Sequence, residues 1–266
     1  MATRTGVTTR RLQKVHPHGV TIPRASSTFR IAHRIARRNT MTKSIALICT
    51  SCDELVPGAK TGAWLEEVAE PYYIARSAGV RVTMVSIKGG AVPIDPASES
   101  GDFFTPSCAK FKEDEEAMSA LRNSAALGSV SAEAFDGVYL AGGHGTCVDF
   151  YKNAALGAFV SAMYAAGKPV AADCHGPIAL LGCTKPNGEP LVKGLKVTGF
   201  SDSEEAAVGL TDKVPELIET AMKAQGGLYT STADWTPNAV VDGNLVTGQN
   251  PASSTACANA FVELLA

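Results

Sequence analysis

The sequence feature that most constrains the fold is a short apolar stretch that turns sharply into an apolar helix, with a cysteine at the corner. Residues 170–181 read VAADCHGPIALL. A side chain lifted out on such a turn needs small residues two positions before and after it, and Ala172 and Gly176 meet that need around Cys174. The N–H groups at a helix start also favour a thiolate. We therefore predict a nucleophile elbow that presents Cys174; a buried structural cysteine is the alternative.

Strand-like and helix-like segments alternate through most of the chain. The apolar run at residues 45–48 has the length of a buried parallel strand, and Trp64, Leu65 and Val68 recur at helical spacing. The alternation predicts one α/β domain over residues 41–266, a doubly wound, mostly parallel, flavodoxin-like sandwich. The expected strands are 44–50, 80–87, 135–141, 169–173 and 195–200, with a short pair near 239–247. The expected helices are 61–78, 112–127, 153–166, 212–225 and 253–265.

The first 40 residues differ in composition from the rest. They contain nine Lys or Arg and no Asp or Glu, and residues 29–38 form a short basic amphipathic stretch. This pattern predicts a transit peptide for import into a chloroplast or mitochondrion. The alternatives are a basic tail, or an upstream extension with Met41 as the working start, in which case the location is cytoplasmic.

The predicted domain is acidic. Setting aside those nine basic residues leaves 15 of the chain's 24 against 26 acidic residues, a net charge of −11. Nucleic acid and anionic membranes are therefore not expected as partners, because both require clustered positive charge. No apolar run approaches the ~18 residues that span a bilayer.

The seven cysteines do not predict a disulfide framework or a metal site. Their odd number and scattered positions favour a reducing compartment. Cys49 and Cys52 form a C-x-x-C pair, but no second pair or nearby histidine completes a zinc site. The Gly142-Gly143-His144-Gly145 turn lacks the spacing of a phosphate-binding loop, so we expect no nucleotide cofactor and no metal.

Three segments follow directly after expected strands: the turn at 142–145, the corner at Cys174 and the acidic segment 201–205. In α/β proteins the catalytic residues lie at the carboxyl ends of the strands. His144 and His175 are the histidines outside the first 40 residues, and we favour His175 as the acid/base, with Gly142 and His144 shaping the pocket. The N–H groups of Gly143 and His175 are expected to receive an oxyanion. An orienting carboxylate is also needed, and Glu66, Glu67, Glu204 and Glu205 compete for that role. Helix periodicity turns Glu67 inward and Glu66 toward water.

Five motifs in order resemble those of the ThiJ/PfpI superfamily, which is class I glutamine amidotransferase-like, and more narrowly its glyoxalase III and stress-chaperone branch. The resemblance covers residues 43–266. The motifs are GAKTG at 58–62 followed by Glu67, AGGHG at 141–145, CHGP at 174–177, VTGFSD at 197–202 and VTGQNPAS at 246–253.

The resemblance implies a cofactor-free glyoxalase III, a lyase of the D-lactate dehydratase type that converts methylglyoxal to lactate without glutathione, with a deglycase activity proposed for members. It assigns the nucleophile to Cys174, the base to His175, the helix carboxylate to Glu67 and the carboxylate that orients His175 to Glu205, with Glu204 as the register alternative. It also implies a homodimer and a small dicarbonyl substrate. The thiolate would add to the aldehyde, and a proton would then move through an enediol.

Other interpretations of the same residues remain. A non-enzymatic stress chaperone or redox sensor would use Cys174 as a site of oxidation to sulfinic acid. Glutamine amidotransfer or peptide hydrolysis uses similar cysteine elbows. A further interpretation is that Cys147 and Cys174 form a disulfide under oxidising conditions. Asp173 would raise the pKa of Cys174 if it faced the same side, but strand alternation sends it to the other.

Overall fold

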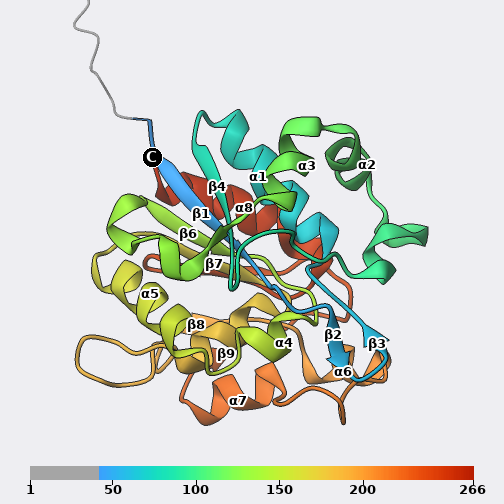
Figure 1. Ribbon diagram of the computed structural model, residues 1–266. Coiled ribbons are helices and arrows are strands. Elements are labelled where there is room, and N and C mark those ends of the chain that lie inside the picture. Colours follow the sequence, from blue (N-terminus) through green and yellow to red (C-terminus); the bar gives the residue numbers. More distant parts are fainter. Residues whose placement is uncertain (1–41) are drawn as a thin grey trace, which may run out of the picture. The chain divides into compact units, whose positions relative to one another are not determined.

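The computed structural model describes residues 42–266 (Figure 1). The predicted transit peptide at residues 1–40 lies outside the described residues. Residues 42–266 form one compact unit. No helix in this part of the chain is long and apolar enough to cross a bilayer.

A seven-stranded sheet lies at the centre, with the strand order β10-β11-β7-β6-β1-β4-β5. Every pair of neighbours is parallel except β10 with β11. The predicted doubly wound, mostly parallel sheet is therefore confirmed. Its strands are β1 (Ser44–Cys49), β4 (Arg81–Ser86), β5 (Ala125–Ala126), β6 (Gly137–Leu140), β7 (Val170–Asp173), β10 (Ala239–Asp242) and β11 (Leu245–Gly248).

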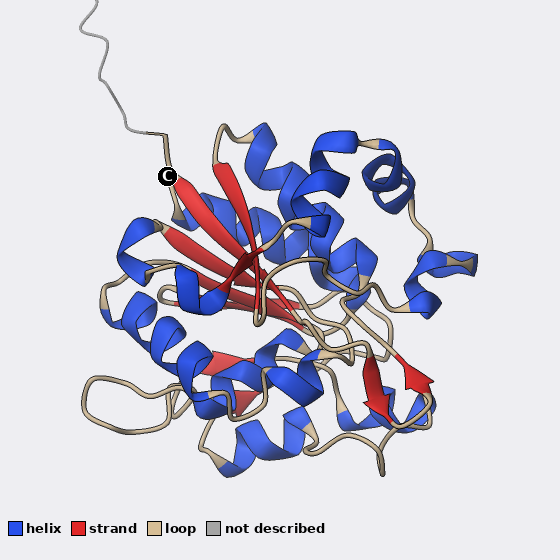
Figure 2. Ribbon diagram, viewed as in Figure 1, coloured by secondary structure: helices blue, strands red, loops and turns tan. Residues whose placement is uncertain are grey.

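Helices cover both faces of the sheet, as Figure 2 shows. Ile45 and Leu47 of β1 enter one buried cluster, and Ala46 and Ile48 enter the other. A strand covered on both faces is apolar at every position, which explains the unbroken apolar run. The first cluster includes side chains of α1 (Leu65–Ser77), α2 (Pro106–Glu113), α3 (Glu115–Arg122) and α8 (Ser254–Leu264). The second includes those of α4 (Thr146–Asp149), α5 (Ala154–Ala165) and α7 (Ile218–Ala224).

The prediction of a single helix at 112–127 is wrong, because two short helices, α2 and α3, lie within residues 106–122. They are separated at Asp114, whose backbone is extended and whose carboxylate accepts the N–H groups of Glu116 and Ala117. A side chain that caps a new helix start stabilises a break there. The helix expected from residue 61 begins at Leu65, and the one expected from 212 begins at Ile218.

The segment expected as a strand at 195–200 is also placed differently. It contributes only β8 (Lys196–Val197), which pairs with β9 (Leu228–Tyr229) outside the central sheet. After it comes the short helix α6 (Asp202–Ala207). A small hairpin of β2 (Glu54–Val56) and β3 (Ala59–Lys60) precedes α1. The helix expected after Cys174 is a 3₁₀ helix over Gly176–Gly182.

Candidate active site

Cys174 lies directly after β7, in a left-handed backbone conformation with φ of 52°. Such a conformation costs a non-glycine residue about 1–3 kcal/mol, so the surrounding structure must hold it. The N–H of Cys174 donates to the carbonyl of Gly248 at 3.0 Å, and its carbonyl accepts the N–H of Phe200 at 2.8 Å. A side chain at Gly176 would overlap the carbonyl of Leu140. The predicted need for a small residue after the cysteine thus has a structural cause.

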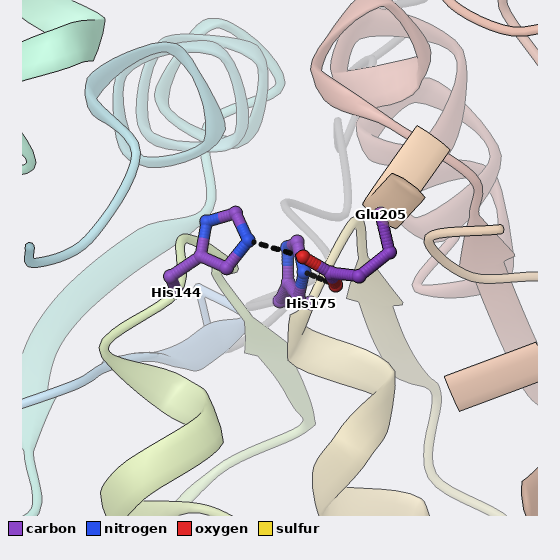
Figure 3. A group of neighbouring side chains, drawn as sticks. All are labelled: His144, His175 and Glu205. Atoms are coloured by element: carbon purple, nitrogen blue, oxygen red, sulfur yellow. Dashed lines mark hydrogen bonds and ion pairs between the residues drawn. The ribbon is translucent and has the colours of Figure 1, made fainter. Parts of the chain in front are cut away.

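A carboxylate, that of Glu205, joins two histidines, His144 and His175, as Figure 3 shows. Sγ of Cys174 lies 3.3 Å from Nδ1 of His175, and Nε2 of the same imidazole lies 2.8 Å from Oε2 of Glu205. The other oxygen of Glu205 lies 2.9 Å from Nε2 of His144. His175 and His144 follow β7 and β6, and Glu205 is on α6. All four side chains belong to buried residues.

The hydrogen bonds fix the protonation of the two imidazoles. Burial by itself raises the pKa of Glu205, but hydrogen bonds from His144 and His175 lower it to about 2. Burial and the neighbouring His144 lower the pKa of His175 to about 4. At neutral pH Glu205 is therefore a carboxylate, which only accepts hydrogen bonds, so both Nε2 atoms carry hydrogen. Nδ1 of His175 is left unprotonated and faces the thiol as a base.

Glu204, the register alternative, points away from the histidines. Its Oε2 accepts the backbone N–H of Ser201 at 3.1 Å, which closes a capping box at the start of α6. Its Oε1 accepts the N–H of Trp235 at 2.9 Å and the amide of Asn250 at 2.8 Å. In this geometry Glu205 is the residue that contacts His175, and Glu204 anchors the segment that carries Trp235.

Glu67 is fully buried on α1 and turns toward the cysteine, whereas Glu66 is partly exposed. Burial and the charge of Asp173 raise the pKa of Glu67 well above its ordinary value, although the thiol of Cys174 partly offsets this. The carboxyl of Glu67 therefore holds its proton to higher pH than an exposed carboxyl does. Neither of its oxygens has a partner in good hydrogen-bond geometry within residues 42–266. A side chain at Gly142 would overlap Oε2 of Glu67, so this glycine makes room for the carboxyl group.

The expected thiolate is wrong for the resting site. Burial, and then the neighbouring carboxyl groups of Glu67 and Asp173, raise the pKa of Cys174 well above its ordinary value. The cysteine is thus a thiol until a base takes its proton. Asp173 points to the other side of the sheet, as alternation predicts, and its Oδ2 accepts the hydroxyl of Tyr139 at 2.8 Å. Its charge nevertheless acts on the thiol through the low-dielectric interior.

The N–H groups expected to bind an oxyanion border the same cavity. Gly143, with φ of 97°, and His175 both line it, and neither N–H has an acceptor among the described residues. A side chain at Gly143 would overlap the carbonyl of Gly62. Donors left free beside a nucleophile are what a developing negative charge requires. The cavity has a volume of about 320 Å³.

Sequence reasoning missed much of the cavity wall. Phe103 and Trp235 line it from segments that carry no helix or strand pattern, and Trp64 and Phe200 line it beside them. Aromatic residues in loops at the carboxyl edge of the sheet were the available signal. Periodicity does not determine the path of a loop, so it does not show which of these rings reach the cavity.

The side chains of His144, His175 and Glu205 are also the group of described residues able to hold a metal ion, since three of their ligand atoms lie within 4.8 Å of one another. In the structure these side chains are hydrogen-bonded to one another, and these bonds orient His175 as a base. All seven cysteines are free thiols, and Cys147 lies buried in the same cluster as Cys174. The disulfide between these two under oxidation stays a prediction.

With this geometry established, sequence comparison assigns the class. Residues 54–264 match the DJ-1/PfpI family, and the chain belongs to that family. Glutathione-independent glyoxalase HSP31 of Saccharomyces cerevisiae is 33% identical over 233 residues, which cover 84% of this chain and 98% of that protein. Glyoxalase 3 of Candida albicans is 30% identical over 220 residues, or 79% of this chain and 93% of that protein.

Solved structures agree with this assignment. The rapid encystment protein of 24 kDa from Francisella tularensis superposes with a TM-score of 0.80 and 36% identity, covering 85% of this chain and 100% of its own. The crystal structure of glyoxalase III from Candida albicans superposes with a TM-score of 0.77 and 29% identity, covering 84% of this chain and 97% of its own.

Proposed function

We propose that this protein is a glutathione-independent glyoxalase that converts methylglyoxal to lactate at Cys174. The observation that carries the proposal is the line from Cys174 through Nδ1 of His175 to the carboxylate of Glu205, with the buried carboxyl of Glu67, whose pKa is raised, beside the same thiol. A nucleophile, a base and a separate proton donor thus meet in one cavity. The names of the yeast relatives support the same reaction.

In the first step Nδ1 of His175 takes the thiol proton while Sγ attacks the aldehyde carbon. Glu205 stabilises the imidazolium that forms, as in other nucleophile–histidine–carboxylate sites. The N–H groups of Gly143 and His175 stabilise the alkoxide. The imidazolium returns its proton to that oxygen, which leaves a neutral hemithioacetal and a neutral base.

In the second step the former aldehyde carbon is oxidised and the ketone carbon is reduced within one molecule. His175 removes the carbon-bound proton while Glu67 protonates the ketone oxygen, which gives an enediol. The imidazolium then protonates the former ketone carbon, and the carboxylate of Glu67 takes the remaining hydroxyl proton. The product is a thioester of lactate on Cys174, with both protein groups restored.

In the third step water, deprotonated by His175, attacks the thioester and releases lactate and the thiol. Every proton is carried by His175 or Glu67, and no external electron acceptor takes part. A neutral thiol in the resting enzyme is compatible with this order of steps, because the base removes the thiol proton only as the carbon–sulfur bond forms.

The test is formation of D-lactate from methylglyoxal by the full chain, without added glutathione or metal. Cys174→Ser and Glu67→Gln are expected to abolish turnover. Glu70→Gln, on the same helix but outside the cavity lining, serves as the control and is expected to retain it. An inactive parent protein would contradict the proposal and favour a stress chaperone or redox sensor.

We also propose import into an organelle, supported by the nine basic and absent acidic residues of the first 40. A fluorescent protein fused after residue 40 should enter chloroplasts or mitochondria, and a fusion to residues 41–266 should stay in the cytoplasm. Cytoplasmic fluorescence from the first fusion would contradict the proposal. The resemblance further supports a homodimer, which light scattering of the purified chain would test.

A further inference from the structure

The part of the cavity away from the thiol is built from aromatic side chains. The rings of Trp64 and Phe103 pack edge to face with centroids 5.2 Å apart. Those of Phe200 and Trp235 lie 5.8 Å apart, and Phe200 also contacts the imidazole of His175 at 4.2 Å. The cavity wall is therefore continuous from the base to an aromatic surface.

The charged groups of the lining are bonded away from this surface. The ammonium of Lys60 pairs with Asp53 and Glu54 at 3.0 and 3.1 Å. The carboxylate of Asp95 accepts the hydroxyl of Thr61 at 2.8 Å and the N–H of Ala97 at 2.9 Å. The cavity thus has a polar end, at the cysteine and histidines, and an apolar end. A phosphate or carboxylate on the distal part of a substrate would find no free cation there among the described residues.

The cavity is also larger than methylglyoxal requires. Its volume of about 320 Å³ equals that of roughly ten water molecules in the liquid. A methyl group on the ketone carbon would fill little of the apolar end. Phe103 and Trp235 remain 46% and 42% exposed. Large aromatic side chains exposed at a cavity mouth gain free energy when an apolar ligand covers them.

We propose that this site takes 2-oxoaldehydes with an aryl or extended apolar group, of the phenylglyoxal type, in preference to methylglyoxal and glyoxal. The inference rests on the proposed glyoxalase function and adds its substrate class. The dicarbonyl head reacts at Cys174 and the ring contacts Trp235 and Phe103. Phenylglyoxal and one water give mandelate through the same steps, with the aldehyde carbon oxidised and the ketone carbon reduced.

The experiment measures kcat and KM of the full chain for glyoxal, methylglyoxal and phenylglyoxal as formation of the 2-hydroxy acid, with Cys174→Ser as the background. The KM for phenylglyoxal is expected to be at least roughly tenfold below that for methylglyoxal, because apolar pockets discriminate by about this factor. Trp235→Ala and Phe103→Ala should lower the ratio of kcat/KM for phenylglyoxal to kcat/KM for methylglyoxal roughly tenfold, because the lost ring contacts serve the aryl group more than the methyl group.

Phe104→Ala is the matched control. Phe104 adjoins Phe103 and is 37% exposed, but it does not line the cavity, so its loss should change neither substrate. Turnover of methylglyoxal with no preference for phenylglyoxal, or an equal effect of Trp235→Ala on both substrates, would overturn the inference and leave the glyoxalase function intact. Absence of turnover with all three aldehydes would overturn the function itself.

Discussion

The carboxylate of Glu205 accepts the Nε2–H of His175 at 2.8 Å, and this hydrogen bond determines which nitrogen of the imidazole faces the nucleophile. Because Nε2 holds the proton, Nδ1 presents a lone pair to Cys174 at 3.3 Å. The same carboxylate binds His144 through its other oxygen. One residue of α6 thus sets the tautomers of two histidines that come from two different strand ends.

Replacing this carboxylate should disable the base without removing it. In Glu205→Gln the amide can donate as well as accept, so His175 is no longer held with its proton on Nε2. We expect kcat to fall by roughly a hundredfold or more, as in other sites whose orienting carboxylate becomes an amide. Steady-state kinetics with methylglyoxal measure this. Glu263→Gln, an exposed carboxylate on α8, should keep full activity. A Glu205→Gln variant with unchanged kcat would refute the tautomer argument.

The choice between Glu204 and Glu205 also shows where sequence reasoning ends. The motif places a carboxylate near the start of α6, but adjacent helical residues point about 100° apart, and only the docking of α6 decides which one meets His175. The sheet, in contrast, was predictable because runs such as residues 45–48 encode burial on both faces locally.

The ionisation of Cys174 could not be predicted for a similar reason. The local turn suggested a thiolate, yet the pKa of the thiol is set by burial and by carboxyl groups on α1 and β7. Glu67 is distant in the chain, and its position beside the thiol depends on how α1 packs on the sheet. The cavity walls at Phe103 and Trp235 depend likewise on loop paths that no periodicity describes.

The pH dependence of activity should reflect these environments. The base must be neutral, and because the pKa of His175 is lowered to about 4, activity should persist down to that pH instead of failing near 6.5. Glu67 must be protonated, so activity should fall as pH rises through its raised pKa. A profile of kcat/KM against pH measures both limbs. An acid limb centred near 6.5 would contradict the assignment of His175.

Asp173→Asn should make Cys174 more reactive. The Asp173 charge raises the pKa values of both Cys174 and Glu67, so a neutral amide should lower both. The rate of alkylation of Cys174 by iodoacetamide should then rise severalfold at neutral pH, with its midpoint at lower pH. An amide oxygen still accepts the hydroxyl of Tyr139, which preserves the packing. An unchanged alkylation profile would show that the charge does not act on the thiol.

The same substitution should change how stability depends on pH. Burial raises the pKa of Asp173 from 3.8 to about 7. A carboxyl with a raised pKa contributes stability that is present below its unfolded value and is lost as pH rises through the folded value. The parent protein should therefore lose this contribution between about pH 4 and about pH 7, and Asp173→Asn should not. Urea unfolding at about pH 5 and about pH 8 compares the two proteins.

Gly142→Ala tests whether the space at this glycine is required by Glu67. The added Cβ would overlap Oε2 of Glu67 and would lie 2.6 Å from the carbonyl of Asp173 and 2.8 Å from the N–H nitrogen of His175. Overpacking of this kind costs about 1–3 kcal/mol. The other two contacts are backbone, so the turn that carries Cys174 must shift as well as the carboxyl of Glu67, and kcat should fall together with the free energy of unfolding.

The matched control is Gly128→Ala, where a Cβ meets nothing within 4 Å and the backbone is not left-handed. This change should leave both kcat and the urea midpoint close to those of the parent. If Gly142→Ala lost stability but kept full kcat, the overlap would be relieved without displacing the carboxyl of Glu67 from the thiol, and the requirement for a glycine at position 142 would be contradicted. A loss of kcat that exceeds the loss of folded protein locates the effect at the active site, where the added Cβ meets both Glu67 and the turn that carries Cys174.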